Sequence, residues 1–118
     1  MLAHMMGTNS EPETAQTILF LEDLDEYLYH IDRMMVQLKR AGKLHNLAGL
    51  VIGHMSDMKD NAIPFGKSAY EIIQHQTQDF SYPVCFGFPV GHELQNLALI
   101  CGREAELVVS DSGVELRY

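Results

Sequence analysis

The sequence predicts a small α/β domain with a mixed sheet, covering helices and a C-terminal β-hairpin. Three short apolar stretches predict buried strands: residues 17–21, 47–52 and 83–86. Helical patterns follow the first two of them. Alternating apolar residues at 104–110, a tight turn at 111–113 and a further run at 114–118 are typical of a hairpin. Strand–helix units that precede a hairpin favour one layered α/β architecture.

Composition limits the classes of function. The 118 residues are enough for one domain with one core, and 47% hydrophobic and 20% charged residues are ordinary globular values. A formal net charge of −8 disfavours nucleic acid and anionic membrane surfaces as partners, because no basic stripe is present to neutralise phosphates. No apolar run reaches the roughly 18 residues of a membrane helix. Cys85 and Cys101 lack a CxxC spacing and are interpreted as reduced, buried thiols of a cytosolic protein.

The first strand ends in a cluster of carboxylates, Glu22-Asp23-Leu24-Asp25-Glu26. Asp23 is predicted to cap the following helix, with Glu26 completing a capping box and Asp25 favoured by the helix dipole. Glu22 has no such local role. In open α/β sheets, the carboxyl ends of the strands are where ligands bind, so Glu22 is a candidate site residue.

Helical spacing of apolar residues predicts a first helix that starts at Leu24 and stops at Gly42. Ser68 with Glu71 three residues later predicts a capping box at the start of a second helix. Between these helices, residues 54–67 are expected to form a long polar loop. A short strand is expected at 97–100, and residues 1–7 are interpreted as the end of a helix.

His92 closes the Gly- and Pro-rich turn at 87–92, directly after the third predicted strand. If the strands are parallel, Glu22 and His92 emerge at the same edge of the sheet. A carboxylate that orients an imidazole is the base half of a nucleophilic triad. The alternative is that His92 is an ordinary surface histidine. Asn96 is expected to hydrogen-bond the turn that carries Gly91 and His92.

Other candidate sites are weaker. The end of residues 61–68 has the Gly-Lys-Ser of a phosphate-binding loop, but Asn61 replaces the required glycine and Pro64 removes an amide. Six histidines occur without an HExxH pair, so a metal site is not expected. Asp32 and Arg33 are interpreted as an exposed polar face of the first helix. No serine occurs in a Gly-x-Ser-x-Gly context, so a nucleophile for Glu22 and His92 is not expected in this chain.

Several separated motifs resemble the LD-carboxypeptidase family of serine peptidases, which includes muramoyl-tetrapeptide carboxypeptidases and microcin C immunity peptidases. The matching segments, in chain order, are ILFLED at 18–23, YHIDRM at 29–34, LVIG at 50–53 and GFPVGH at 87–92, with Asn96 and Gly102 after them. The resemblance implies that residues 1–118 are the family's small, swivelling C-terminal β/β/α domain. It also implies a Ser-Glu-His triad in which Glu22 and His92 are catalytic, while the serine belongs to an N-terminal domain.

The resemblance further implies a cytoplasmic homodimer that removes the terminal D-alanine of a murein tetrapeptide during peptidoglycan recycling. It implies no metal or other cofactor. Without the serine domain, the chain is expected to be inactive alone. Two alternatives remain open at this stage: a microcin-immunity peptidase that cleaves a peptidyl-nucleotide amide, and a non-catalytic module for peptide binding or dimerisation.

Overall fold

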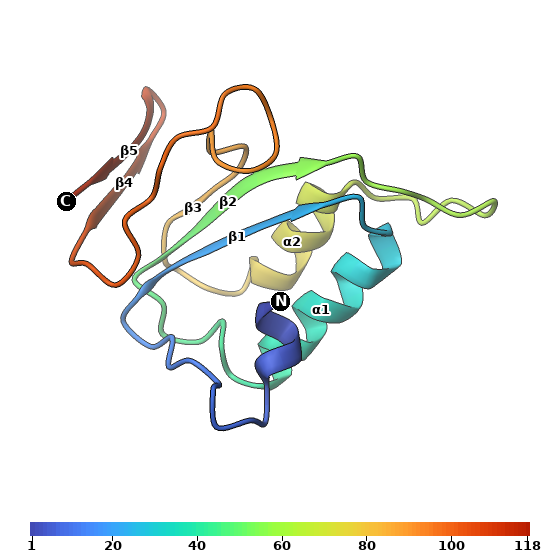
Figure 1. Cartoon of the computed structure of the whole chain (residues 1–118), viewed down its shortest axis with the longest axis horizontal. Coiled ribbons are helices and arrows are strands. Elements are labelled where there is room, and N and C mark those ends of the chain that lie inside the picture. Colours follow the sequence, from blue (N-terminus) through green and yellow to red (C-terminus); the bar gives the residue numbers. More distant parts are fainter.

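The computed structural model describes residues 1–118 and contains a three-stranded parallel sheet, two α-helices and a separate β-hairpin. In chain order, the elements are the 3-10 helix η1 (Leu2–Met5), β1 (Ile18–Leu24), α1 (Leu28–Arg40), β2 (Gly49–Ser56), α2 (Ala69–Thr77), β3 (Val84–Cys85), β4 (Glu106–Ser110) and β5 (Gly113–Arg117). Figure 1 shows the helices beside the sheet and the hairpin at the far end of the domain. The predicted α/β class and the C-terminal hairpin are confirmed.

The sheet has the order β1-β2-β3, so β2 is the central strand. β1 pairs with β2 in parallel from Ile18, opposite Gly49, to Leu24, opposite Ser56, with a bulge between Leu21 and Asp23. β4 and β5 pair only with each other. The parallel strands and the hairpin therefore form two sheets, where the sequence suggested one mixed sheet.

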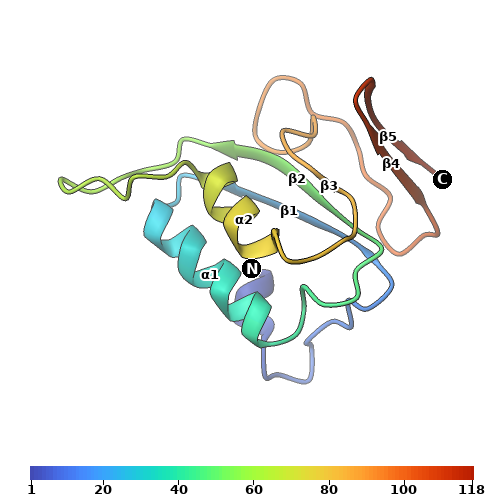
Figure 2. The same ribbon diagram turned by 180° about the vertical axis from the view of Figure 1, so that it is seen from behind.

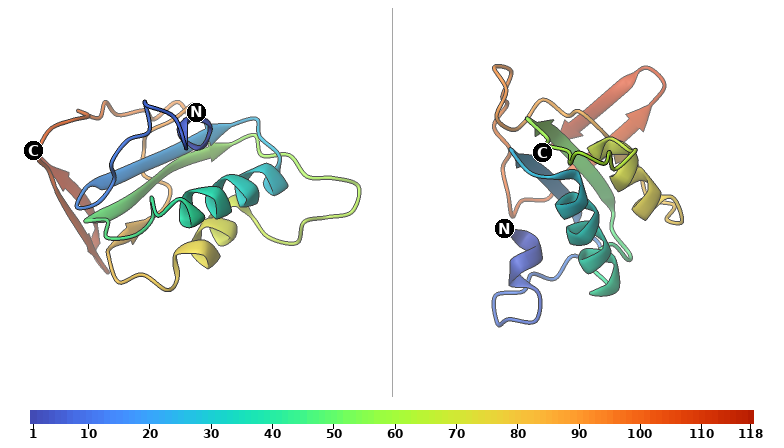
Figure 3. Two further views of the ribbon diagram at one scale, coloured as in Figure 1. Left: turned by 90° about the horizontal axis from the view of Figure 1, so that it is seen from below. Right: turned by 90° about the vertical axis from the view of Figure 1, so that its right-hand side faces the viewer.

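Both α-helices cover the same face of the parallel sheet. Figure 2 shows α1 and α2 side by side in front of the strands, and Figure 3 shows the chain between β3 and β4 on the opposite side. The core lies between the helices and the strands, where its largest fully buried side chains are Leu44, Leu50, Ile52, Ile72 and Ile73. Burial of these branched apolar groups is the main driving force for this layered arrangement.

The predicted capping of α1 is wrong. Asp23 lies inside β1, and α1 begins only at Leu28, with Tyr27 at the N-cap position and no side-chain cap. Pairing with β2 extends β1 to Leu24, and the chain turns at Asp25, which has a φ of 60° and donates its N–H to the carbonyl of Ser56. Sheet pairing therefore overrides the local capping preference of the acidic residues.

The capping box of α2 is confirmed. The Ser68 hydroxyl accepts the N–H of Glu71, and the Glu71 carboxylate accepts the N–H of Ser68 at 2.7 Å. The hydrogen bonds to the amide and hydroxyl of Ser68 hold the pKa of the Glu71 carboxyl below its ordinary value. Ser68 therefore starts a helix, as its capping box predicts.

Ser68→Ala is expected to lower the free energy of unfolding by about 1 kcal/mol, because the Glu71 N–H loses its side-chain acceptor. Urea denaturation followed by circular dichroism measures this change. Ser81→Ala is the control, since Ser81 is exposed outside any helix, and a change within about 0.5 kcal/mol is expected there. An equal decrease in the free energy of unfolding of the two variants would contradict the stabilising role of the cap.

The end of β2 and the segment at residues 97–100 differ from the sequence-based expectations. β2 runs on to Ser56, so the long loop begins at residue 57, and Figure 1 shows it extending away from the domain. Residues 97–100 form no strand. They are held instead by a hydrogen bond from the Leu97 N–H to the Pro89 carbonyl and another from the Ile100 N–H to the Tyr118 hydroxyl.

The expectation of two buried thiols is correct for one cysteine only. Cys85 is buried in β3, where burial raises the pKa of its thiol, whereas Cys101 is exposed. Neither forms a disulfide. The predicted end of α1 is confirmed, because the chain leaves the helix through Gly42 with a φ of +77°. A residue with a side chain is strained in this left-handed region, which explains the glycine.

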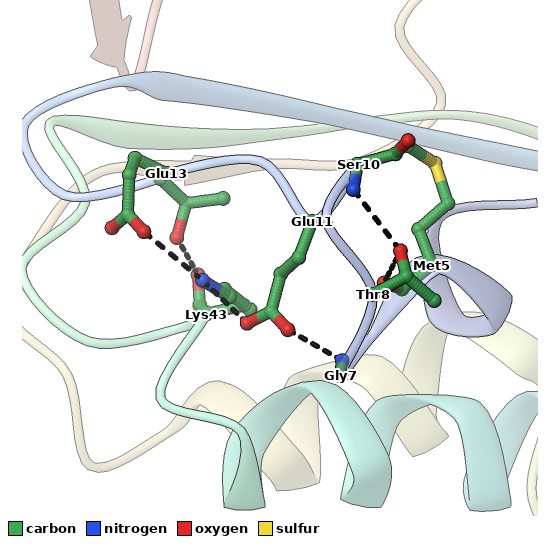
Figure 4. A network of polar contacts seen from close by, with 8 residues as sticks. Met5, Gly7, Thr8, Ser10, Glu11, Glu13 and Lys43 are labelled. Atoms are coloured by element: carbon green, nitrogen blue, oxygen red, sulfur yellow. Dashed lines mark hydrogen bonds and ion pairs between the residues drawn. The ribbon is translucent and has the colours of Figure 1, made fainter.

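A polar network fastens the N-terminal segment to the loop between α1 and β2 (Figure 4). The Lys43 ammonium group lies 2.8 Å from the Glu11 carboxylate, which also accepts the N–H of Gly7. The Thr14 hydroxyl donates to the Lys43 carbonyl at 2.8 Å. The hydrogen bond from Lys43, followed by that from the Gly7 N–H, holds the pKa of the Glu11 carboxyl below its ordinary value.

A lowered pKa in the folded state means that ionised Glu11 stabilises the fold above the ordinary glutamate pKa of 4.5, and that this contribution is lost as the pH falls below it. Glu11→Gln is therefore expected to reduce the drop in melting temperature between about pH 7 and about pH 3.5. Glu13→Gln is the control, because that carboxylate is 93% exposed and lies 3.9 Å from the Lys43 ammonium. The same acid sensitivity in Glu11→Gln and the unsubstituted chain would contradict the prediction.

Candidate active site

The structure brings Glu22 and His92 together at the carboxyl edge of the parallel sheet. The His92 Nδ1 lies 3.0 Å from the Glu22 Oε2, although the two residues are 70 positions apart in the chain. The Glu22 side chain is 24% exposed and the His92 side chain 52% exposed. This hydrogen bond favours the tautomer with the proton on Nδ1, which leaves the Nε2 lone pair free to accept a proton. The pair therefore has the geometry of a general base and the acid that orients it.

Glu22 takes its position from the bulge in β1. The register shifts between Leu21 and Asp23, so that Glu22 lies at the irregular step between them. A bulge changes the direction in which a side chain points, and bulges are common next to functional sites. The preceding apolar residues of β1 pair regularly with β2, which fixes the point where the carboxylate leaves the sheet.

His92 is positioned by a turn that lies against β2. The Phe88 N–H donates to the Ile52 carbonyl at 3.0 Å, and the His54 N–H donates to the Val90 carbonyl at 2.9 Å. These two bonds continue the attachment of β3 to β2 after regular pairing has ended. They hold the chain immediately before His92 within reach of Glu22.

Gly91 and Asn96 also support this turn. Gly91 has a φ of +139°, and a Cβ atom there would lie 3.1 Å from both the Glu22 Oε2 and the His54 Cβ. A side chain at this position would be strained and would crowd the carboxylate. The Gly91 N–H donates to the Asn96 Oδ1 at 3.2 Å, as the sequence suggested. The contacts expected of these residues are therefore formed, whereas their roles in catalysis stay predictions.

The neighbouring polar groups form no hydrogen bond with His92. The Ser56 hydroxyl donates to the Glu93 carboxylate at 2.7 Å, and His92 forms no hydrogen bond with a serine. The His54 Nδ1 is buried and has no hydrogen-bond partner. Sequence reasoning missed both the Ser56–Glu93 pair and the closeness of His54, because long-range contacts leave no mark in local spacing.

A second histidine–carboxylate pair occurs at the start of α1, where the His30 Nδ1 lies 2.5 Å from the Glu26 Oε1. The hydrogen bond from His30, followed by that from the Tyr27 N–H, holds the pKa of the Glu26 carboxyl below its ordinary value. Further along α1, the Arg33 guanidinium lies 4.8 Å from the centre of the Tyr29 ring. Arg33 is exposed and does not contact Glu22, in agreement with a polar helix face.

No group of three or more His, Cys, Asp or Glu side chains converges on a point that could hold a metal ion. Neither α-helix combines the length and hydropathy that crossing a bilayer requires. What the site offers is proton transfer at the His92 Nε2 and compensation of the imidazolium charge by Glu22.

Comparison with known proteins identifies the family of the chain. The sequence model described as the LD-carboxypeptidase C-terminal domain matches residues 1–107. The chain is 32% identical over 111 residues to the "Probable murein peptide carboxypeptidase" of Bacillus subtilis, an alignment that covers 91% of this chain and 34% of that protein. A candidate carboxypeptidase of Synechocystis sp. is 34% identical over 104 residues, an alignment that covers 88% of this chain and 35% of that protein. The chain thus spans about a third of the length of these curated relatives.

Solved structures show the same relationship. The crystal structure of muramoyltetrapeptide carboxypeptidase from Oxalobacter formigenes matches with a TM-score of 0.86 at 34% identity, covering 98% of this chain and 41% of that one. The microcin C7 self immunity protein MccF matches with a TM-score of 0.64 at 21% identity, covering 75% and 26%, which shows a shared fold. Because the family model matches most of its residues, the chain belongs to the LD-carboxypeptidase family and corresponds to its C-terminal domain.

Proposed function

We propose that Glu22 and His92 are the acid and the base of a Ser-Glu-His triad in an LD-carboxypeptidase. The observation that carries the proposal is the 3.0 Å hydrogen bond from the His92 Nδ1 to the Glu22 Oε2. A partly shielded carboxylate bound to Nδ1 fixes the imidazole tautomer and stabilises the imidazolium that forms during catalysis. The half-exposed ring leaves Nε2 accessible to a nucleophile and a substrate.

The nucleophile in this proposal is a serine outside residues 1–118. Within the chain, Ser56 is buried and its hydroxyl donates to Glu93, the residue that follows His92 in the sequence. The Oxalobacter relative is more than twice as long as the aligned region, which gives room for a further domain in an enzyme of this type. One MccF structure is an active-site mutant in which a serine, an asparagine and a lysine are replaced by alanine, so a serine belongs to the active site of that protein.

The proposed substrate is a murein tetrapeptide, and the bond cleaved is the amide to its terminal D-alanine. The serine hydroxyl attacks the amide carbonyl while the His92 Nε2 takes its proton. His92 then donates this proton to the nitrogen of the departing D-alanine, and water hydrolyses the acyl-enzyme with His92 again as base. Support comes from the names of the Bacillus and Oxalobacter relatives, both of which refer to murein peptides.

We further propose that the complete enzyme works in peptidoglycan recycling as a cytoplasmic homodimer. The free, exposed thiol of Cys101 supports a reducing compartment. Light scattering of the complete enzyme measures its oligomeric state, and a monomer would contradict the dimer.

A second candidate is a microcin-immunity peptidase, favoured by the fold shared with MccF, whose structures include a complex with aspartyl sulfamoyl adenosine. The experiment that tests the proposed function compares the two substrates on the complete enzyme. Release of D-alanine from murein tetrapeptide, with little cleavage of the aminoacyl sulfamoyl adenosine, is expected. The reverse preference would support the second candidate.

The isolated 118-residue chain is the control for both reactions, and it is expected to hydrolyse neither substrate because it lacks the nucleophile. Calorimetric titration of this chain with murein tetrapeptide tests the remaining alternative, a non-catalytic binding module. Tight binding by the isolated chain, together with inactivity of the complete enzyme, would contradict the peptidase proposal.

A further inference from the structure

Gly53 is an unusual residue for its place in the fold. It lies within the central strand β2, between Ile52 and His54, the two residues that hydrogen-bond the turn before His92. Its φ is not in the left-handed region, unlike that of Gly91, so the backbone conformation does not explain why glycine stands there. Glycine weakens a strand interior, and it often marks a point where another backbone approaches closely.

Two segments approach Gly53 closely: the part of β1 that carries Glu22 and the turn that carries His92. A Cβ atom at this position would lie 2.5 Å from the Val90 carbonyl oxygen and 3.1 Å from the Glu22 Cβ, with the Phe20 ring at 3.0 Å. Val90 stands two residues before His92. The position thus touches the strand that carries the carboxylate and the turn that carries the imidazole.

Of these three contacts, the Val90 oxygen is the hardest to move away from a new Cβ atom, because it belongs to the backbone. Two hydrogen bonds clamp the turn to β2 on either side of Gly53, one from the Phe88 N–H to the Ile52 carbonyl and one from the His54 N–H to the Val90 carbonyl. The backbone of Gly53 is also fixed by α2, since the Tyr70 hydroxyl donates to the Gly53 carbonyl at 3.2 Å. A side chain at residue 53 would therefore displace the turn.

We propose that Gly53 is a positioning residue for the Glu22–His92 pair: its missing side chain lets the turn lie close enough to β2 for the His92 Nδ1 to reach the Glu22 Oε2. The geometric part of this inference concerns the present chain alone, whereas its consequence for catalysis rests on the proposed function. A methyl group at residue 53 moves the turn away and crowds Glu22, so the hydrogen bond lengthens. His92 then loses the acceptor that keeps its proton on Nδ1.

The test is the tautomer of the neutral His92 imidazole, measured by ¹⁵N NMR of the 118-residue chain. The unsubstituted chain is expected to hold the Nδ1–H form, and Gly53→Ala is expected to shift the ring toward the Nε2–H form that an unconstrained histidine side chain prefers. Gly49→Ala is the matched control on the same strand. Its new Cβ would meet the end of the flexible Leu107 side chain at 2.7 Å, far from the turn, so an unchanged tautomer is expected.

Two further measurements keep the inference open to contradiction if Gly53→Ala folds poorly. Amide exchange in the unsubstituted chain should be slow at Phe88 and His54, and fast exchange at both would overturn the inference, because the turn would not be fixed to β2. The double variant Phe20→Leu/Gly53→Ala removes the ring contact and leaves the Val90 contact. It should still lack the Nδ1–H tautomer, and recovery of that tautomer would show that Phe20, and not the turn, responds to residue 53.

Activity separates the inference from the proposed function. In the complete enzyme, Gly53→Ala is expected to lower kcat by about 10²-fold with KM little changed, the usual size for a catalytic group misplaced by about 1 Å. A folded Gly53→Ala chain that keeps the Nδ1–H tautomer overturns the inference, whatever the activity. A lost tautomer in an enzyme whose activity does not depend on His92 would leave the geometric inference standing and overturn the proposed function.

Discussion

His92→Ala is expected to lower the kcat for D-alanine release by about 10⁵- to 10⁶-fold in the complete enzyme, the size of effect seen when the base of a serine-peptidase triad is removed. The reason is that the serine hydroxyl loses its proton acceptor and the leaving amine loses its proton donor. KM should change little, because the imidazole acts mainly in the transition state. Steady-state kinetics with murein tetrapeptide measures both constants.

His30→Ala is the matched control for this variant. His30 also pairs with a carboxylate, that of Glu26, but it lies at the start of α1 and does not contact the Glu22–His92 pair. A change in kcat of less than about threefold is expected. If the two alanine variants retained similar activity, His92 would be a surface histidine, and the catalytic assignment would be wrong.

Glu22→Gln is expected to lower kcat by about 10⁴-fold, the effect of replacing the orienting acid of a triad by its amide. The amide group can donate to the His92 Nδ1, which places the imidazole proton on Nε2 and removes the lone pair that should accept the serine proton. The side chain keeps its size, so the fold and the melting temperature should be preserved.

Glu93→Gln is the control for the loss of a negative charge near His92. The Glu93 carboxylate accepts from the Ser56 hydroxyl and makes no contact with the His92 imidazole. An amide oxygen can accept the same hydrogen bond, so a change of less than about threefold in kcat is expected. Equal losses in Glu22→Gln and Glu93→Gln would show that general electrostatics, and not the tautomer, explains the effect.

Sequence reasoning predicted the elements whose signal is local. The capping box of Ser68 and Glu71 is formed because both partners lie within one helical turn, and the hairpin follows from alternation around a tight turn. The cap at Asp23 was wrong for the opposite reason. Pairing of β1 with β2 is a long-range contact, and it continues past the residues that would otherwise start a helix.

Sequence reasoning predicted the Glu22–His92 pair and the support of its turn by Asn96, but it did not predict the contacts that β2 makes with this turn. Glu22 and His92 each follow a strand, and parallel pairing of those strands with β2 brings them to one edge, where they form a hydrogen bond. The role of Gly53 could not be read from spacing, because it depends on the distance between a strand and a turn 37 residues later. A glycine directly after the apolar run Leu50-Val51-Ile52 was the available signal.

The most direct test of the central claim is covalent labelling of the complete enzyme with a fluorophosphonate, followed by mass-spectrometric mapping of the modified serine. The account predicts a label on a serine outside residues 1–118, and a labelling rate that falls strongly in His92→Ala and Glu22→Gln but not in His30→Ala. A label on a serine within these residues, or a labelling rate independent of His92, would contradict it.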